Sequence, residues 1–122
     1  MSIKVNHGDV APEDTEYHTV WRHFRRDGPV GVGVGIVAVK AIPDRGDPDS
    51  QAEAHDVPEV HYVLSGAGVL RDEGVDTPLR AGDAVVTPAG HRHTMWSTSK
   101  DEPIVMVYVA MSPTAMGGGE RR

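Results

Sequence analysis

Glycine and proline divide this chain into segments too short for most helices. Its 122 residues include 14 glycines and 9 prolines, and no segment of ten or more residues shows helical periodicity. The intervening segments are rich in valine, and several alternate with period two, as strands do. Strands are expected at residues 28–43, 60–70 (with a turn at 65–68), 83–88 and 103–111, and an extended segment at 15–24. Such closely spaced strands and turns predict an all-β sandwich or barrel.

The length of the chain predicts one domain, which we place at residues 15–111. Residues 1–14 are polar and are expected to be an irregular N-terminal segment. Residues 112–122 are rich in glycine and charge and are expected to be a flexible C-terminal tail. The largest internal loop is expected at residues 43–52.

Composition excludes several classes of function. The chain has no cysteine, which rules out disulfides, thiolate zinc sites and thiol nucleophiles. Its 18 acidic and 12 basic residues give a net charge of −6, which argues against a nucleic-acid partner. No apolar stretch is long enough to span a membrane, and the first residues form no apolar signal region, so a cytoplasmic protein is expected.

Alternating glycines in the segment 28–43 allow two interpretations. Glycine weakens a strand and supplies no side chain, so it can mark a barrel corner or a close approach of two strands. The glycine face can instead leave a cavity in a small barrel that side chains would otherwise fill. The face in question carries Gly31, Gly33, Gly35, Val37 and Val39.

Two histidines and two glutamates occur at odd positions between residues 53 and 61. If one strand runs through Glu53, His55, Glu59 and His61 without a break, all four side chains share a face. Pro58 can interrupt that strand or introduce a bulge. Imidazole and carboxylate together suit iron, manganese, nickel, copper or zinc. The alternative is a strand face that is simply solvated.

A second histidine pair follows a Pro-Ala-Gly turn. His91 and His93 lie two residues apart, so that one ring can enter a barrel while the other stays outside. We expect His91 to be exposed. Tyr108 and Met106 alternate with valines on the last strand and are expected in the core.

These two stretches together resemble the two motifs of the cupin superfamily. The second motif, G-x5-P-x-G-x2-H-x3-N, is matched without a gap, and serine replaces the final asparagine. In the first motif the second histidine, the glutamate and the closing glycine are present, and Glu53 stands in place of the first histidine. The matching residues are His55, Glu59 and Gly66 in the first motif and Gly82, Pro88, Gly90, His93 and Ser97 in the second. The resemblance spans residues 46–97.

The resemblance implies a double-stranded β-helix (jelly-roll-like) cupin barrel that holds a divalent transition metal. Carried over by position, His55, Glu59 and His93 would be ligands, with Glu53 a possible fourth. Iron, manganese or zinc would suit this donor set best, and nickel is possible. His61 has three open roles: an alternative ligand to Glu53, a proton shuttle, or a group that only orients Glu59.

The leading functional hypothesis is a metal-dependent enzyme that acts on a small organic molecule inside the barrel, by dioxygenase, isomerase, cyclase or lyase chemistry. His61 or Glu53 would move the proton. The alternative is a non-catalytic barrel that binds or senses a sugar or another small molecule. A third hypothesis keeps the barrel as structure alone, with His55 and His93 as remnants. The resemblance also implies a homodimer, in which pairing would cover exposed strand edges.

Overall fold

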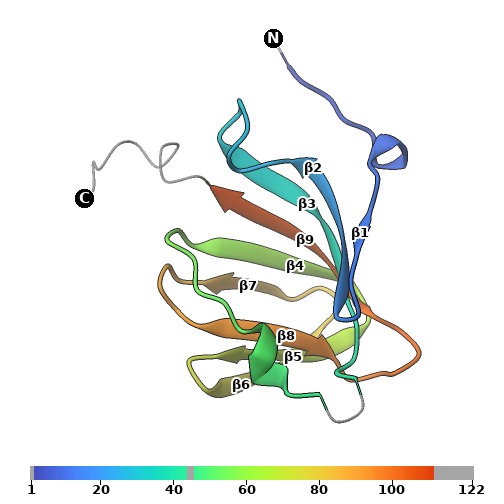
Figure 1. Cartoon of the computed structure of the whole chain (residues 1–122), viewed down its shortest axis with the longest axis vertical. Coiled ribbons are helices and arrows are strands. Elements are labelled where there is room, and N and C mark those ends of the chain that lie inside the picture. The colour runs from blue at the N-terminus through green and yellow to red at the C-terminus, as the bar shows by residue number, and fades with distance from the viewer. Residues whose placement is uncertain (1, 44–45, 112–122) are drawn as a thin grey trace.

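The computed structural model describes residues 2–43 and 46–111, and within them the chain is built almost entirely of strands (Figure 1). The tail expected at residues 112–122 lies outside the described part. The strands are β1 (Glu13–Asp14), β2 (His18–Phe24), β3 (Val32–Val39), β4 (Glu59–Ser65), β5 (Ala67–Asp72), β6 (Val75–Arg80), β7 (Ala84–Thr87), β8 (His93–Ser97) and β9 (Ile104–Met111). Two short 3-10 helices are η1 (His7–Asp9) and η2 (Pro48–Gln51).

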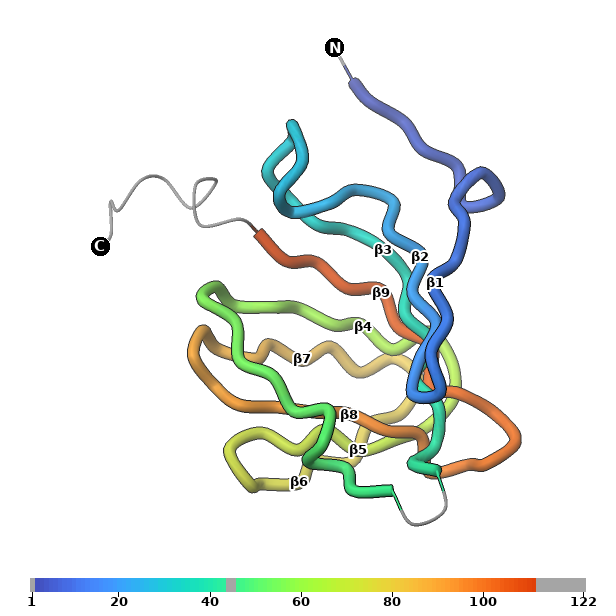
Figure 2. Tube along the Cα trace, viewed as in Figure 1, coloured from blue at the N-terminus to red at the C-terminus, as the bar shows by residue number. Residues whose placement is uncertain are grey.

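Two antiparallel sheets enclose the interior. The larger has the strand order β1-β2-β3-β9-β4-β7, and the smaller has the order β6-β5-β8. Both views show β5, β6 and β8 gathered below the large sheet, with η2 lying beside β8 (Figures 1 and 2). The prediction of an all-β, double-sheeted barrel is confirmed.

Three strands were not foreseen: β1, which lies in the segment expected to be irregular, β6 and β8. β6 contains Pro78, which cannot donate a backbone hydrogen bond and therefore argues against a strand in the sequence. The strand is possible because β6 is an edge strand of the smaller sheet, paired only with β5. An edge strand leaves one side unpaired, so proline is tolerated there.

The strand register of the large sheet aligns apolar residues of neighbouring strands in a row across the sheet. Val20 pairs with Val37, Val37 with Met106 and Met106 with Val63, across β2, β3, β9 and β4. Directly paired residues point to the same face, so this row is a continuous apolar band inside the barrel. Met106 and Val63 are completely buried, and Leu70 of the smaller sheet completes the contact. This band is the centre of the hydrophobic core.

Gly33 and Gly35 are buried and face inward, and both lie close to neighbouring backbone. A Cβ atom on Gly35 would collide with the Trp21 carbonyl oxygen and would lie 2.7 Å from the Tyr108 hydroxyl oxygen. Gly35 is therefore required by close packing. Gly33 lines an interior cavity, and a Cβ atom on it would lie 3.2 Å from the Arg26 amide nitrogen and 3.3 Å from the Ala110 carbonyl oxygen. Gly33 is therefore also closely packed against its neighbours.

The outer face of the same sheet is apolar and exposed. Val60, Tyr62, Leu64 and Val86 are between 38% and 59% exposed. They lie on the neighbouring strands β4 and β7. In the part of the chain that the structure describes, no helix is long and apolar enough to cross a membrane.

Candidate metal centre

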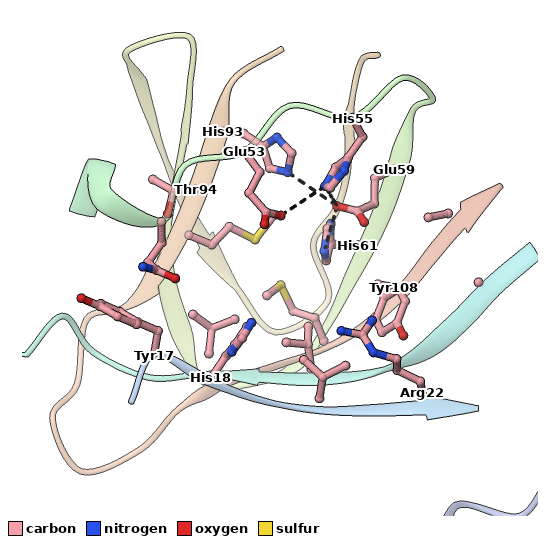
Figure 3. A pocket seen from close by; sticks show the side chains of 18 of the residues that line it. Tyr17, His18, Arg22, Glu53, His55, Glu59, His61, His93, Thr94 and Tyr108 are labelled. Carbon is pink, nitrogen blue, oxygen red and sulfur yellow. Dashed lines mark ion pairs between the residues drawn. The ribbon is translucent and has the colours of Figure 1, made fainter. Parts of the chain in front are cut away.

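A cavity of about 530 Å³ opens between the sheets, beside the core band. Volumes of this order are typical of sites for small molecules. Polar side chains from β4, β8 and the loop before β4 gather on one wall of this cavity (Figure 3). The strands β2, β3 and β9 form another part of its lining.

Glu59 and His61 reach the cavity from one strand. They are the first and third residues of β4, so both side chains point inward. The condition that one unbroken strand carries residues 53–61 is not met, because β4 begins only at Glu59. His55 therefore lies in a loop, and Pro58 follows the bend at residues 56–57 and directly precedes the strand.

Backbone contacts hold that loop against β8. The Glu53 amide donates to the His93 carbonyl oxygen at 2.9 Å, and the His93 amide donates back to Glu53 at 2.8 Å. The Gly90 amide then donates to the His55 carbonyl oxygen at 2.7 Å. Gly90 has a φ of 81°, which favours glycine and explains its place in the Pro-Ala-Gly turn. This bridge carries His55 to the side of His93.

Three histidine rings surround one carboxylate oxygen. Glu59 Oε1 lies 3.5 Å from His93 Nε2, and 3.8 Å from both His55 Nε2 and His61 Nε2. The donor atoms of His55, Glu59 and His93 all lie within 4.8 Å of one another. Figure 3 shows these side chains pointing toward a common point. Geometry thus brings together the three residues that the cupin motifs select.

His93 is held in the tautomer that a metal ligand needs. Its Nδ1 lies 3.1 Å from the His91 carbonyl oxygen, and this contact is a hydrogen bond only when Nδ1 carries the proton. Nε2 then presents a lone pair to the cluster. The contact with Glu59 raises the pKa of His93 above its ordinary value, although burial opposes the rise.

Glu59 stays ionised in this setting. Burial by itself would raise the pKa of its carboxyl, but the contact with His93 and the neighbouring histidine rings outweigh burial and leave the pKa below its usual value. The carboxylate is thus available as an oxygen ligand at neutral pH.

His61 is buried, with 7% of its surface exposed, close to the 8% of His93. Burial lowers the pKa of His61, so the ring is neutral at pH 7. Its Nδ1 has no hydrogen-bond partner among the described residues. An unsatisfied buried polar atom costs on the order of 1–3 kcal/mol, and such costs persist at sites with a function.

Glu53 and His91 lie at the margin of the cluster. The Glu53 side chain is 69% exposed, and its closest contact there is His55 Nε2, at 3.5 Å. His91, which was expected to be exposed, has a side chain that is 42% exposed and pairs with Asp72 at 3.0 Å. Neither residue belongs to the group of three donors.

Sequence reasoning missed much of the cavity lining, including Arg22 and Tyr108. Arg22 and Tyr108 line the cavity on the side away from the triad (Figure 3). Tyr108 belongs to the core cluster as expected, but it also reaches the cavity. The sequence indicated only which face of its strand each residue lies on. The pairing between distant strands was needed to show that these two residues lie together.

Comparison with known proteins identifies the family. A family model described as a cupin domain matches residues 42–110, more than half of the chain. A curated relative, the oxalate-binding protein of Thermotoga maritima, is 39% identical over 44 residues, and the match covers 36% of each protein. The chain thus matches only about a third of that relative's length.

Solved structures share the fold at low identity. A predicted oxalate decarboxylase from Thermotoga maritima has a TM-score of 0.72 at 18% identity, covering 90% of this chain and 99% of that one. Hydroxypropylphosphonic acid epoxidase from S. wedmorenis has a TM-score of 0.72 at 15% identity, covering 90% and 59%. An RmlC-like cupin from Shewanella frigidimarina has a TM-score of 0.70 at 16% identity, covering 93% and 92%. The family model and the shared fold agree with the motifs, and the chain belongs to the cupin superfamily.

Proposed function

We propose that this chain is a metal-dependent cupin enzyme that acts on a small organic molecule in the barrel cavity. His55, Glu59 and His93 would hold the ion. The observation that carries the proposal is the convergence of two imidazole nitrogens and one carboxylate oxygen on the wall of a cavity of suitable size.

Two histidines and one carboxylate are the donor set typical of non-haem iron(II) sites, so iron(II) is our first choice, ahead of manganese, zinc and nickel. When bound, such an ion would polarise a substrate oxygen or, if it is iron, activate dioxygen. Solved structures that share the fold include an epoxidase, a predicted oxalate decarboxylase and HppE in its Fe(II) form. The Fe(II) form supports a metal in the barrel without choosing the reaction.

The remaining polar residues have separate roles in this proposal. His61 would hold or pass a proton, because its ring is buried and neutral and its Nε2 faces Glu59. Glu53 would stay outside the metal shell, since its side chain lies at the rim and is largely exposed. There it can pass protons between the cavity and solvent.

A binding protein is the second candidate. The local match to a protein named as oxalate-binding favours it. In that case the triad would hold a ligand or an ion without turnover.

We also propose a homodimer. The exposed apolar residues on the outer face of β4 and β7 support it, because a continuous apolar patch on a monomer marks a contact surface. A second copy of the chain would cover this patch.

Elemental analysis of the purified protein tests the metal site, with His93→Ala and His91→Ala compared in parallel. We expect about one transition metal per chain in the wild type and in His91→Ala, and none in His93→Ala. His91 is the matched control because it is a histidine two residues away that lies outside the triad. If iron is found, oxygen consumption with candidate substrates tests turnover. No metal in any of these proteins, even after incubation with iron, manganese, nickel and zinc, would favour the binding protein.

A further inference from the structure

A polar row crosses the large sheet next to the core band. Arg22 of β2 pairs with Gly35 of β3, Gly35 with Tyr108 of β9, and Tyr108 with His61 of β4. Paired residues point to the same face, so Arg22, Tyr108 and His61 all face the interior. The row therefore links the triad side of the cavity to its opposite side.

The missing side chain at Gly35 lets Tyr108 lean across the row. A Cβ atom there would lie 2.7 Å from both Cε2 and the hydroxyl oxygen of Tyr108, so the ring occupies the space above Gly35. Arg22 lies beyond that space, and Figure 3 shows its guanidinium beside the Tyr108 ring. Burial raises the pKa of Tyr108, and Arg22 only partly opposes the rise, so the hydroxyl keeps its proton and can donate.

Arg22 contacts Glu13 and Tyr108 and also lines the cavity. Its Nε lies 3.3 Å from both carboxylate oxygens of Glu13. The outer end of the guanidinium points into the cavity (Figure 3). A guanidinium presents paired donors in one plane, which match a carboxylate.

Arg26 and Lys40 are paired with Asp56 and Asp14. Arg22 and Arg25 instead share the one carboxylate of Glu13, so this pair carries an excess positive charge that supports an anionic ligand. Four basic side chains line the cavity against three acidic ones, whereas the whole chain has 12 basic and 18 acidic residues. One of the three acids is Glu59, which the proposed metal would neutralise in part. The basic residues are Arg22, Arg25, Arg26 and Lys40, and the acidic ones are Asp27, Glu53 and Glu59.

We propose that Arg22 and Tyr108 form a carboxylate anchor, so that the substrate is a small organic acid bound at its far end by this pair. Val37 and Met106, which line the cavity in the next row, would contact an aliphatic middle. The second polar end of the substrate would reach the triad. That last contact rests on the proposed metal site, whereas the anchor does not.

Isothermal titration with three five-carbon probes tests the anchor: glutarate, valerate and uncharged valeramide. In metal-free protein we expect valerate to bind and valeramide to bind at least about 10-fold more weakly. Arg22→Gln should weaken valerate binding by roughly 10- to 100-fold. Arg25→Gln is the matched control, because Arg25 lines the same cavity and also contacts Glu13, at 3.2 Å. It should weaken binding by less than about 5-fold.

Tyr108→Phe provides a second variant if Arg22→Gln fails to fold, as judged by circular dichroism. It keeps the ring and removes only the hydroxyl, and it should weaken valerate binding by roughly 3- to 10-fold. In metal-loaded protein, glutarate should bind more tightly than valerate, because its second carboxylate reaches the triad.

The outcomes separate the anchor from the metal site. Equal losses in Arg22→Gln and Arg25→Gln, or equal binding of valerate and valeramide, would overturn the anchor even if metal binds. Absence of carboxylate binding would do the same. A selective loss in Arg22→Gln, in a protein that binds no metal, would support the anchor while the proposed enzyme fails.

Discussion

In the large sheet part of the inner face is polar and the outer face is apolar, which reverses the usual arrangement of an antiparallel sheet. The inner row contains Arg22, Tyr108 and His61, whereas the next row along, on the outer face, contains apolar Val107 and Tyr62. Antiparallel sheets usually pack an apolar face on the core and leave a polar face in water. Here part of the inner face is polar and lines a cavity, and the outer face is apolar and exposed.

The large sheet therefore has three parts with different roles: a core band, a cavity wall and an exposed outer face. The apolar band through Val37, Met106 and Val63 supplies the core. The adjacent inner positions line the cavity and carry the polar groups of Arg22, Tyr108 and His61. The outer face, with Tyr62 and Leu64 about half exposed, lacks a partner within the described chain and is the surface that we propose a second copy covers.

A side chain added on the inner face should cause the largest loss of stability. Gly35→Val would place a side chain against the Trp21 carbonyl oxygen and the Tyr108 ring. We expect a loss of about 3 kcal/mol or more in the free energy of unfolding. Chemical denaturation measures it, with Ile36→Val as control, since Ile36 is the next residue on the outer face and should lose about 0.5–1.5 kcal/mol. Similar losses in the two variants would contradict the close packing at Gly35.

Met106 and Val107 are neighbours on β9 that point to opposite faces, so shortening each side chain compares how much the two faces contribute to stability. Met106→Ala removes a completely buried core side chain and should destabilise by about 2–5 kcal/mol. Val107→Ala, on the outer face, should destabilise a monomer by less than about 1.5 kcal/mol. If a second copy covers this face, the loss at Val107 will depend on protein concentration, as thermal melts at several concentrations would show. A larger loss at Val107 than at Met106 would contradict the position of the core.

A charge on the outer face should break the proposed dimer. Leu64→Asp should weaken self-association by about 10-fold or more, because a carboxylate would be buried without a partner. Light scattering over a range of concentrations measures this, and metal content should stay unchanged. Val75→Asp is the matched control, because Val75 is apolar and 65% exposed but lies on β6 of the smaller sheet. A wild-type protein that is monomeric at all concentrations would remove the dimer from consideration.

The smallest effect, a change in metal affinity, is expected for Glu53 at the rim of the cavity. Glu53→Gln should change metal affinity by less than about 5-fold, because the Glu53 side chain is 69% exposed and touches only His55 in the cluster. Glu59→Gln removes the central carboxylate and should weaken metal binding by at least about 100-fold. Competition with a metal chelator measures both. Equal effects would make Glu53 a fourth ligand.

Much of the fold was predictable because its signals are local. Period-two valine segments mark β3, β4 and β9, and glycines with positive φ close the turns at Gly66 and Gly90. The spacing of the two motifs also selected His55, Glu59 and His93 before their geometry was known. The path of the chain between residues 53 and 59 was not predictable, because a backbone bridge to His93 replaces the expected strand.

Residue order alone therefore establishes most of the long strands, their alternating parity and the three candidate ligands, since each depends on neighbours or on fixed spacing. Only the folded chain shows that Arg22 and Tyr108 share a row with His61, or that the apolar outer positions on β4 and β7 form one surface. These relations depend on the register between strands that lie far apart in the sequence. Cross-strand register is set by packing of the whole barrel, which no local pattern contains.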